Sequence, residues 1–131
     1  MTTDRESAEY WYGELIEGLR LISSEFEVQE RRLPEFVHLP DEVLNAVSLD
    51  TLGLVVSAGL LSKEQYSKVQ VLDEALENIE LPSDYEEMIE QMKSGDDFKA
   101  LRLHARDLLT CLNQPYMEPN ISAIYVKGST S

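Results

Sequence analysis

The chain has 131 residues, of which 25 are acidic and 11 are basic, so its formal net charge is −14. A chain of this length fits one domain with a core of its own, and the single cysteine, Cys111, excludes an intramolecular disulfide. The charge argues against nucleic acid and anionic membrane surfaces as partners, because both are bound chiefly by lysine and arginine.

The first predicted element is one long helix over about residues 4–32. Apolar side chains recur there at alternating spacings of four and three, which places them on one stripe of a helix. They are Ala8, Tyr12, Leu15, Leu19, Ile22 and Phe26. Thr3 and Glu6 have the spacing of a capping box at its start. The stripe fits either an ordinary bundle helix or a coiled-coil dimer. We favour the bundle helix, because the heptad pattern does not continue past Leu33.

A connection and a short helix are predicted next. Pro34 and Pro40 bracket residues 35–39, and a residue that precedes proline disfavours helical geometry. We therefore expect this segment to be an extended crossover loop. Two acidic residues then favour the start of a short helix over 41–47.

The stretch 51–61 is almost free of charge, so we expect it to form the buried centre of the domain. Ser48 and Asp50 are candidate caps for a helix that runs through it to Leu61. Gly59 either allows close packing or ends this helix.

Two further helices are predicted from capping-box patterns. Ser62 and Gln65 form such a pattern and open a helix that we expect Pro82 to stop. Ser83 and Glu86 repeat the pattern at the start of the next helix.

A last helix follows the break at Gly95. It starts at Asp96 or Asp97, carries apolar residues in heptad spacing, and ends at 113–115 (NQP). Its core positions are Phe98, Leu101, Ala105, Leu108 and Leu112.

These elements predict an all-α fold: a single-domain bundle of five or six helices over 1–127, with antiparallel neighbours and short connections. An extended C-terminal tail completes the domain, and we expect the last residues, 128–131, to be frayed.

The tail has a different pattern from the bundle. Pro115 and Pro119 preclude a helix, and 121–126 (ISAIYV) has the β-branched and aromatic content of a strand. Two interpretations are open. The tail lies over the bundle with Ile121 and Tyr125 tucked in, or it pairs as a strand with a second chain.

The negative charge is concentrated between Asp73 and Asp97. This stretch has ten acidic residues against one base, Lys93, so it supplies nine of the fourteen net negative charges. The acidic residues recur along two predicted helices, which turns the excess into two neighbouring carboxylate faces. Lys99, Arg102 and Arg106 form a basic stripe on the last helix that offsets them only in part.

These faces either keep the protein in solution or bind a basic partner. For partner binding, the predicted contact residues are Glu74, Glu77, Asp84, Tyr85, Glu87 and Glu90. The carboxylates would attract the basic partner electrostatically, and Tyr85 or Tyr66 would supply the aromatic anchor that usually dominates interface energy. Tyr85 is also a predicted core position, so the two roles conflict.

Candidate chemistry is sparse. Glu35 and His38 have the Glu-x-x-His spacing of carboxylate-bridged metal sites, but such a site needs a second pair and two more glutamates on helices. Asp107 could orient His104 for acid–base work, yet no nucleophile is placed nearby. Cys111 lies on an apolar face, where a thiol is usually a small buried hydrophobe. The acidic residues lie on predicted helices and not in an EF-hand loop, which argues against calcium. We predict no catalytic residue, no cofactor site and no metal site.

Four runs of the sequence carry a resemblance. They are 39–43 (LPDEV), 59–65 (GLLSKEQ), 72–73 (LD) and 98–106 (FKALRLHAR). They resemble the pattern of a group of small acidic bacterial proteins associated with toxin-immunity loci, over about residues 35–112. Phe98 stands where tryptophan is expected and His104 where leucine is expected, and the first helix and the tail lie outside the similarity. The resemblance implies a non-enzymatic inhibitor or a relative of one.

The sequence therefore predicts a non-enzymatic acidic binding protein, an immunity-type inhibitor of a basic bacterial toxin. The alternatives are a homodimeric helical scaffold or regulatory subunit that uses the first helix and the tail, and a small helical enzyme that acts through His104 or His38. No apolar run approaches the roughly 20 residues that span a bilayer. Residues 1–6 also lack the basic start and apolar stretch of a signal peptide, so we expect a cytoplasmic location.

Overall fold

The computed structural model describes residues 4–120, and within this range the chain forms helices and no strand. The helices are α1 (Asp4–Ser23), α2 (Phe26–Arg32), α3 (Leu39–Leu44), α4 (Leu52–Ser57), α5 (Lys63–Glu77), α6 (Tyr85–Ser94) and α7 (Asp96–Cys111), with a 3₁₀ turn at Leu49–Thr51. Residues 114–120 have no regular secondary structure. The predicted all-α bundle with an extended tail is confirmed. The predictions for 121–126 and 128–131 concern residues outside the described range.

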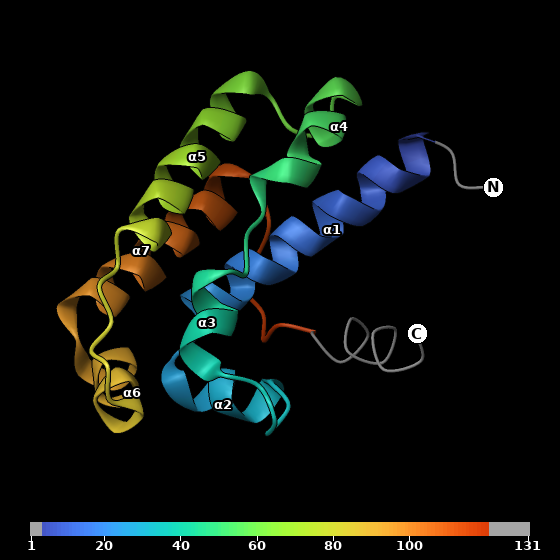
Figure 1. The fold of residues 1–131 in the computed structure, drawn as a ribbon. Coiled ribbons are helices and arrows are strands. Elements are labelled where there is room, and N and C mark those ends of the chain that lie inside the picture. The colour runs from blue at the N-terminus through green and yellow to red at the C-terminus, as the bar shows by residue number, and fades with distance from the viewer. Residues whose placement is uncertain (1–3, 121–131) are drawn as a thin grey trace.

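The helices α1 and α7 form the centre of the bundle, and the other helices pack around this pair (Figure 1). The helices α3 and α4 pack against α1, whereas α5 and α6 pack against α7. The predicted stripe of the first helix faces this core, since Leu15, Leu19 and Ile22 are buried. The stripe is therefore used inside the bundle, as favoured over a coiled coil.

The long first helix was predicted without a break, and the structure divides it at Ser24 and Glu25. The hydroxyl groups of Ser23 and Ser24 both donate to the carbonyl oxygen of Arg20, at 3.1 and 2.7 Å. Serine side chains that bond nearby backbone groups compete with the helical ladder. The chain consequently turns, and α2 begins at Phe26.

The predicted extended loop over 35–39 is wrong, because residues 35–37 form a turn and Leu39 already belongs to α3. The backbone N–H of Val37 donates to the carbonyl of Pro34 at 3.3 Å. The next helix starts at Leu39, before the predicted position, because Pro40 is tolerated in a first turn where its missing N–H costs no bond. It ends at Leu44, where the side chain and backbone N–H of Asn45 both donate to the carbonyl of Asp41.

The uncharged stretch 51–61 is only partly buried. Leu52, Val55 and Leu61 are enclosed, whereas other apolar side chains of the stretch are half-buried. The predicted cap is wrong, since Ser48 makes no side-chain capping bond. Gly59 has a φ of +80° directly after α4, which confirms that it ends this helix.

The predicted ends of the later helices are right in part. Ser62 and Gln65 form the capping box of α5, with backbone-to-side-chain bonds of 2.9 and 3.0 Å. The cap of α6 is Asp84 and not Ser83, because the carboxylate accepts from the backbone N–H of Glu87 at 3.1 Å. A carboxylate caps as well as a hydroxyl and adds a favourable charge at the helix start. Asn113, with a φ of 58°, follows the end of α7.

Candidate functional site

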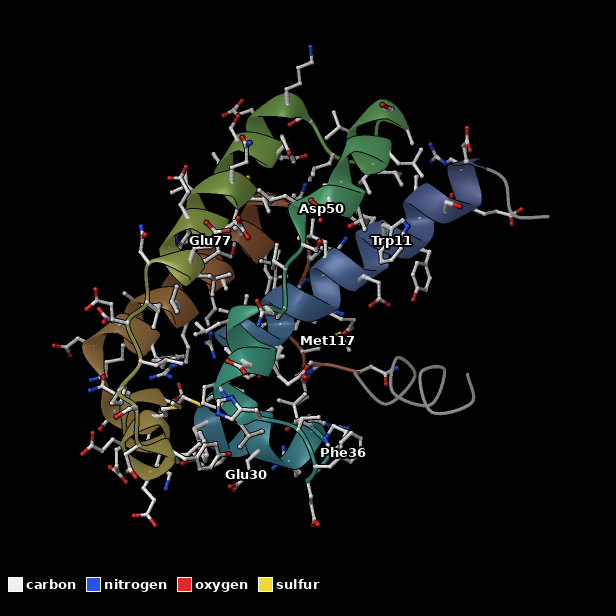
Figure 2. The ribbon with its side chains drawn as sticks, in the orientation of Figure 1. Trp11, Glu30, Phe36, Asp50, Glu77 and Met117 are labelled. Atoms are coloured by element: carbon white, nitrogen blue, oxygen red, sulfur yellow. The ribbon has the colours of Figure 1, made fainter. Side chains whose placement is uncertain are left out.

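The six residues predicted to contact a partner are all exposed. Glu74 and Glu77 lie on α5, Asp84 caps α6, and Tyr85, Glu87 and Glu90 lie on α6. The helices α5 and α6 each pack mainly against α7, and the connection 78–84 separates them. Glu77 consequently lies away from α6 (Figures 1 and 2). The two carboxylate faces are not packed side by side as predicted, because α5 ends well before Pro82.

One part of this set is brought together around an open hollow, which we call the acidic hollow. Its lining residues are Glu80, Leu81, Pro82, Asp84, Glu86, Glu87, Glu90 and Gln91. Glu74 and Glu77 are not among them. Glu80 and Glu86 were missed as contact residues, although both belong to the acidic stretch of the sequence. The prediction that α5 runs to Pro82 had placed Glu80 on the α5 face.

Tyr85 is neither a core residue nor fully exposed. Its side chain is 44% exposed, and its ring centroid lies 5.2 Å from that of His38. The imidazole of His38 is in turn held by Asp41, with Nδ1 and Oδ2 3.1 Å apart. This contact fixes one side of the tyrosine ring and leaves part of it accessible. Tyr66, the other predicted anchor, is half-buried on α5.

Across residues 4–120, none of the ten acidic residues between Asp73 and Asp97 forms an ion pair with a basic side chain. The one base among them, Lys93, lies over the ring of Phe26 at 5.2 Å from its centroid. The acidic surface therefore keeps its charge uncompensated by close contacts in the described part of the chain.

The predicted basic stripe does not face these acids. Arg102 is buried and donates from Nη1 to the carbonyl of Met92 at 3.1 Å. This carbonyl belongs to the last turn of α6, where carbonyl groups lack helical partners. Arg106 donates to the carbonyl of Ser23 at 3.2 Å. Of the stripe, only Lys99 is an exposed side chain on α7 without such a structural bond.

Contacts from four arginines hold the segment 113–120, which we call the C-terminal strap; they come from Arg20, Arg31, Arg32 and Arg106. Glu118 pairs with both Arg31 and Arg32, and the latter ion pair measures 2.6 Å. Arg20 donates to the carbonyl of Pro115 at 3.2 and 3.3 Å. The strap is thereby fastened across α1 and α2, which sequence reasoning missed because the partners are distant in the chain.

Tyr116 adds an aromatic contact to the strap. Its hydroxyl lies 2.8 Å from the hydroxyl of Ser24, and the guanidinium of Arg106 lies 4.7 Å from its ring centroid. Because Ser24 donates its own proton to the carbonyl of Arg20, the tyrosine is the donor in this pair. The strap thus packs over the serine break between α1 and α2.

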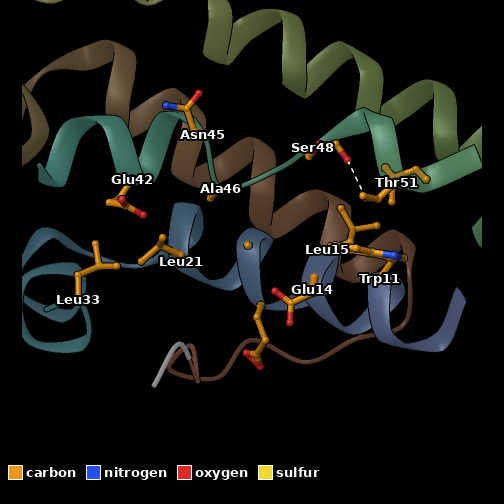
Figure 3. Close-up of a pocket in the computed structure, with 13 residues that line it drawn as sticks. Trp11, Glu14, Leu15, Leu21, Leu33, Glu42, Asn45, Ala46, Ser48 and Thr51 are labelled. Atoms are coloured by element: carbon orange, nitrogen blue, oxygen red, sulfur yellow. Dashed lines mark hydrogen bonds between the residues drawn. The ribbon is translucent and has the colours of Figure 1, made fainter. Parts of the chain in front are cut away.

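A second hollow, which we call the α1 pocket, lies between α1 and the segment from α3 to α4 (Figure 3). Its volume is about 220 Å³. Its apolar walls come from Trp11, Leu15, Leu21, Leu33, Ala46 and Leu52, and Glu14, Glu17 and Glu42 add carboxylates to the lining. Gly18 also lines the pocket, and its missing Cβ lets the carbonyl oxygen of Ala46 approach α1 closely. No motif in the sequence indicates this pocket.

The candidate chemical residues are not assembled into a reactive site by the described chain. Within residues 4–120, no group of three or more His, Cys, Asp and Glu side chains could hold a metal ion. His104 is half-buried in a shallow hollow between α5 and α7 and has no hydrogen bond to Asp107 within that range. Cys111 is half-buried, with its Sγ 3.7 Å from Nζ of Lys68.

No protein-family model, curated protein or solved structure matches this chain. Among the described helices, none has the length and apolar character to cross a membrane. The resemblance to toxin-immunity proteins therefore stays a prediction, and the case for a function depends on the geometry and charge of the surface.

Proposed function

We propose that the chain is a non-enzymatic binding protein that receives a basic protein partner at the acidic hollow. One observation carries the proposal. The acidic residues of 73–97 have no ion-pair partner within residues 4–120, whereas Arg102 and Arg106 of the adjoining helix α7 are used in structural bonds. A single-sign surface of this kind attracts oppositely charged proteins and accelerates their association.

Fold stability gives no reason for this surface. Exposed ion pairs contribute only about 0 to 1 kcal/mol each, and here even that contribution is missing on the acidic side. Like charges gathered on one surface repel one another, which opposes folding. The surface therefore lowers the stability of the folded chain. Binding of a partner, or the need for charge to stay in solution, would account for it.

Tyr85 suits the role of anchor in such an interface. It lies in sequence between two lining residues, Asp84 and Glu86, and its ring is partly exposed while His38 holds one side. Interface energy concentrates in such aromatic side chains, and a ring that is already held in place loses little entropy on binding.

The class of partner that we favour is a basic bacterial toxin, with this chain as its immunity-type inhibitor. Toxins that act on nucleic acid need basic clefts to bind phosphates. An acidic helix end that fills such a cleft blocks substrate by occupying the same charges. The resemblance over residues 35–112, which includes the whole of α6 and α7, supports the same class.

The test reverses the sign of three charges at the acidic hollow by replacing glutamates with lysines. The test variant is Glu80→Lys, Glu87→Lys and Glu90→Lys, which leaves the capping carboxylate of Asp84 in place. The control variant is Glu30→Lys, Glu35→Lys and Asp107→Lys, at exposed positions away from the hollow, with the same change in net charge. Each tagged chain is cross-linked in its source cells, and the captured proteins are identified by mass spectrometry.

We expect one basic protein to be recovered with the wild type and the control variant and to be lost with the test variant. Its Kd, measured with purified proteins, should rise steeply with salt concentration, because salt screens the attraction between the two charged surfaces. If that protein is toxic when expressed alone, co-expression of the wild type should restore growth and the test variant should not. Equal recovery with both variants would overturn the proposal.

A further inference from the structure

The α1 pocket is independent of the acidic hollow and raises a separate question, namely what occupies it. Its volume of about 220 Å³ lies below the roughly 300–1,000 Å³ of pockets that hold drug-sized ligands. The space suits a few apolar side chains. Its walls are aromatic and aliphatic, from Trp11, Leu15, Leu21, Leu33 and Leu52.

The described chain ends beside Glu17, one of the residues that line this pocket. The backbone N–H of Asn120 donates to Oε2 of Glu17 at 3.1 Å, and Glu17 lines the pocket. Arg20 holds the other carboxylate oxygen of Glu17 at 3.0 Å, so the anchoring carboxylate is itself fixed. The strap leading to it is held by Glu118 between two arginines. The last described residue is therefore fixed to a residue of the pocket lining.

The residues that follow have the matching chemistry. The segment 121–127 (ISAIYVK) carries four large apolar side chains and ends in the cation Lys127. Seven extended residues reach about 23–25 Å, which is enough for a segment that starts from Asn120 to enter the pocket. These apolar side chains match the aromatic and aliphatic walls of the pocket.

We propose that the α1 pocket is the docking site of the chain's own segment 121–127. The tether at Glu17 makes docking intramolecular, so the effective concentration of the segment at the pocket is high and weak contacts suffice. The alternative occupants are the same segment of a second copy and an external ligand.

The experiment uses the only tryptophan of the chain, Trp11, which lines the pocket. The test variant is the full chain with Ile121→Ser, Ile124→Ser and Val126→Ser, which keeps length and charge. The control variant is Ser122→Thr, Ser129→Thr and Ser131→Thr in the same terminal residues. Tryptophan emission and its quenching by acrylamide are measured, with far-ultraviolet circular dichroism to verify that the helices are retained.

We expect a red-shifted emission maximum and stronger quenching in the test variant, and wild-type values in the control. A synthetic peptide of residues 121–131, added to a chain shortened after Asn120, should restore the emission. Unchanged emission in the test variant, or no effect of the peptide, would overturn the proposal. So would a dimer in light scattering whose dissociation on dilution exposes Trp11, because the segment would then come from a second copy.

Discussion

The two sides of the bundle treat charge in opposite ways. Along α1, α2 and the C-terminal strap, each arginine described above has a carboxylate, a carbonyl or an aromatic ring as its partner. Along α6 and the connection before it, the carboxylates form no ion pair within residues 4–120. Charged groups on the first side make contacts that hold the fold, whereas the carboxylates on the second side make no ion pair in the described part of the chain.

We expect the largest loss of stability from a substitution at Arg102, whose charge is used inside the fold. Arg102→Ala removes a buried side chain and leaves the carbonyl of Met92 without its donor, so we expect a loss of about 2–4 kcal/mol in the free energy of unfolding. Lys99→Ala, on an exposed position of the same helix, should change it by less than about 0.5 kcal/mol. Urea denaturation measures both. Equal effects would mean that the buried arginine has no structural role.

A smaller effect is expected in the strap. Tyr116→Phe removes the hydroxyl that donates to Ser24 and keeps the ring under Arg106, so we expect a loss of about 1 kcal/mol. Tyr85→Phe on the acidic side is the matched control, since within residues 4–120 its hydroxyl has no hydrogen bond, and it should change stability by less than about 0.5 kcal/mol. Thermal unfolding followed by circular dichroism compares the two. A larger loss for Tyr85→Phe would reverse the assignment of the two sides.

Much of the fold followed from local sequence signals. The stripe through Leu15 and Leu19, the capping box at Ser62 and Gln65, and the helix end at Gly59 each depend on residues close together in the chain. Patterns of this kind predict helices because the spacing of side chains and the capping bonds are local. They do not predict the break at Ser24, since serine is common in helices and its backbone bond competes only in some contexts.

The surface was harder to predict than the helices. Exposure of Glu87 and Glu90 followed from the periodicity of α6, but their grouping with Glu80 depends on where α5 ends and how the connection folds. The role of Arg102 was predicted wrongly because helical spacing gives a face and not the partner across it. The strap requires pairings between residues far apart in the chain, such as Glu118 with Arg32, which are 86 positions apart. The α1 pocket likewise brings α1 together with residues 42–52, and no local pattern contains either pairing.

The smallest effect on stability is expected on the acidic side, and its sign is the informative part. Glu77→Gln, Glu87→Gln and Glu90→Gln remove three charges that have no ion-pair partner within residues 4–120. Neutralisation relieves repulsion among like charges, so stability should stay the same or rise by up to about 1 kcal/mol at low ionic strength. The gain should fade as salt rises, because the Debye length shortens to about 8 Å at physiological ionic strength.

Glu118→Gln is the matched control for this variant, because it also removes a carboxylate from the surface. Glu118 bridges Arg31 and Arg32, so its neutralisation should lower stability, by about 0–1 kcal/mol given the partial exposure of all three side chains. Urea denaturation at low salt measures the change in the free energy of unfolding for both variants. Changes of opposite sign would establish that carboxylates stabilise one side of the bundle and destabilise the other. A loss of more than about 1 kcal/mol in the triple variant would show that the acidic side is structural. The proposed binding role would then lose the observation that carries it, because a surface that stabilises the fold needs no partner to account for its charge.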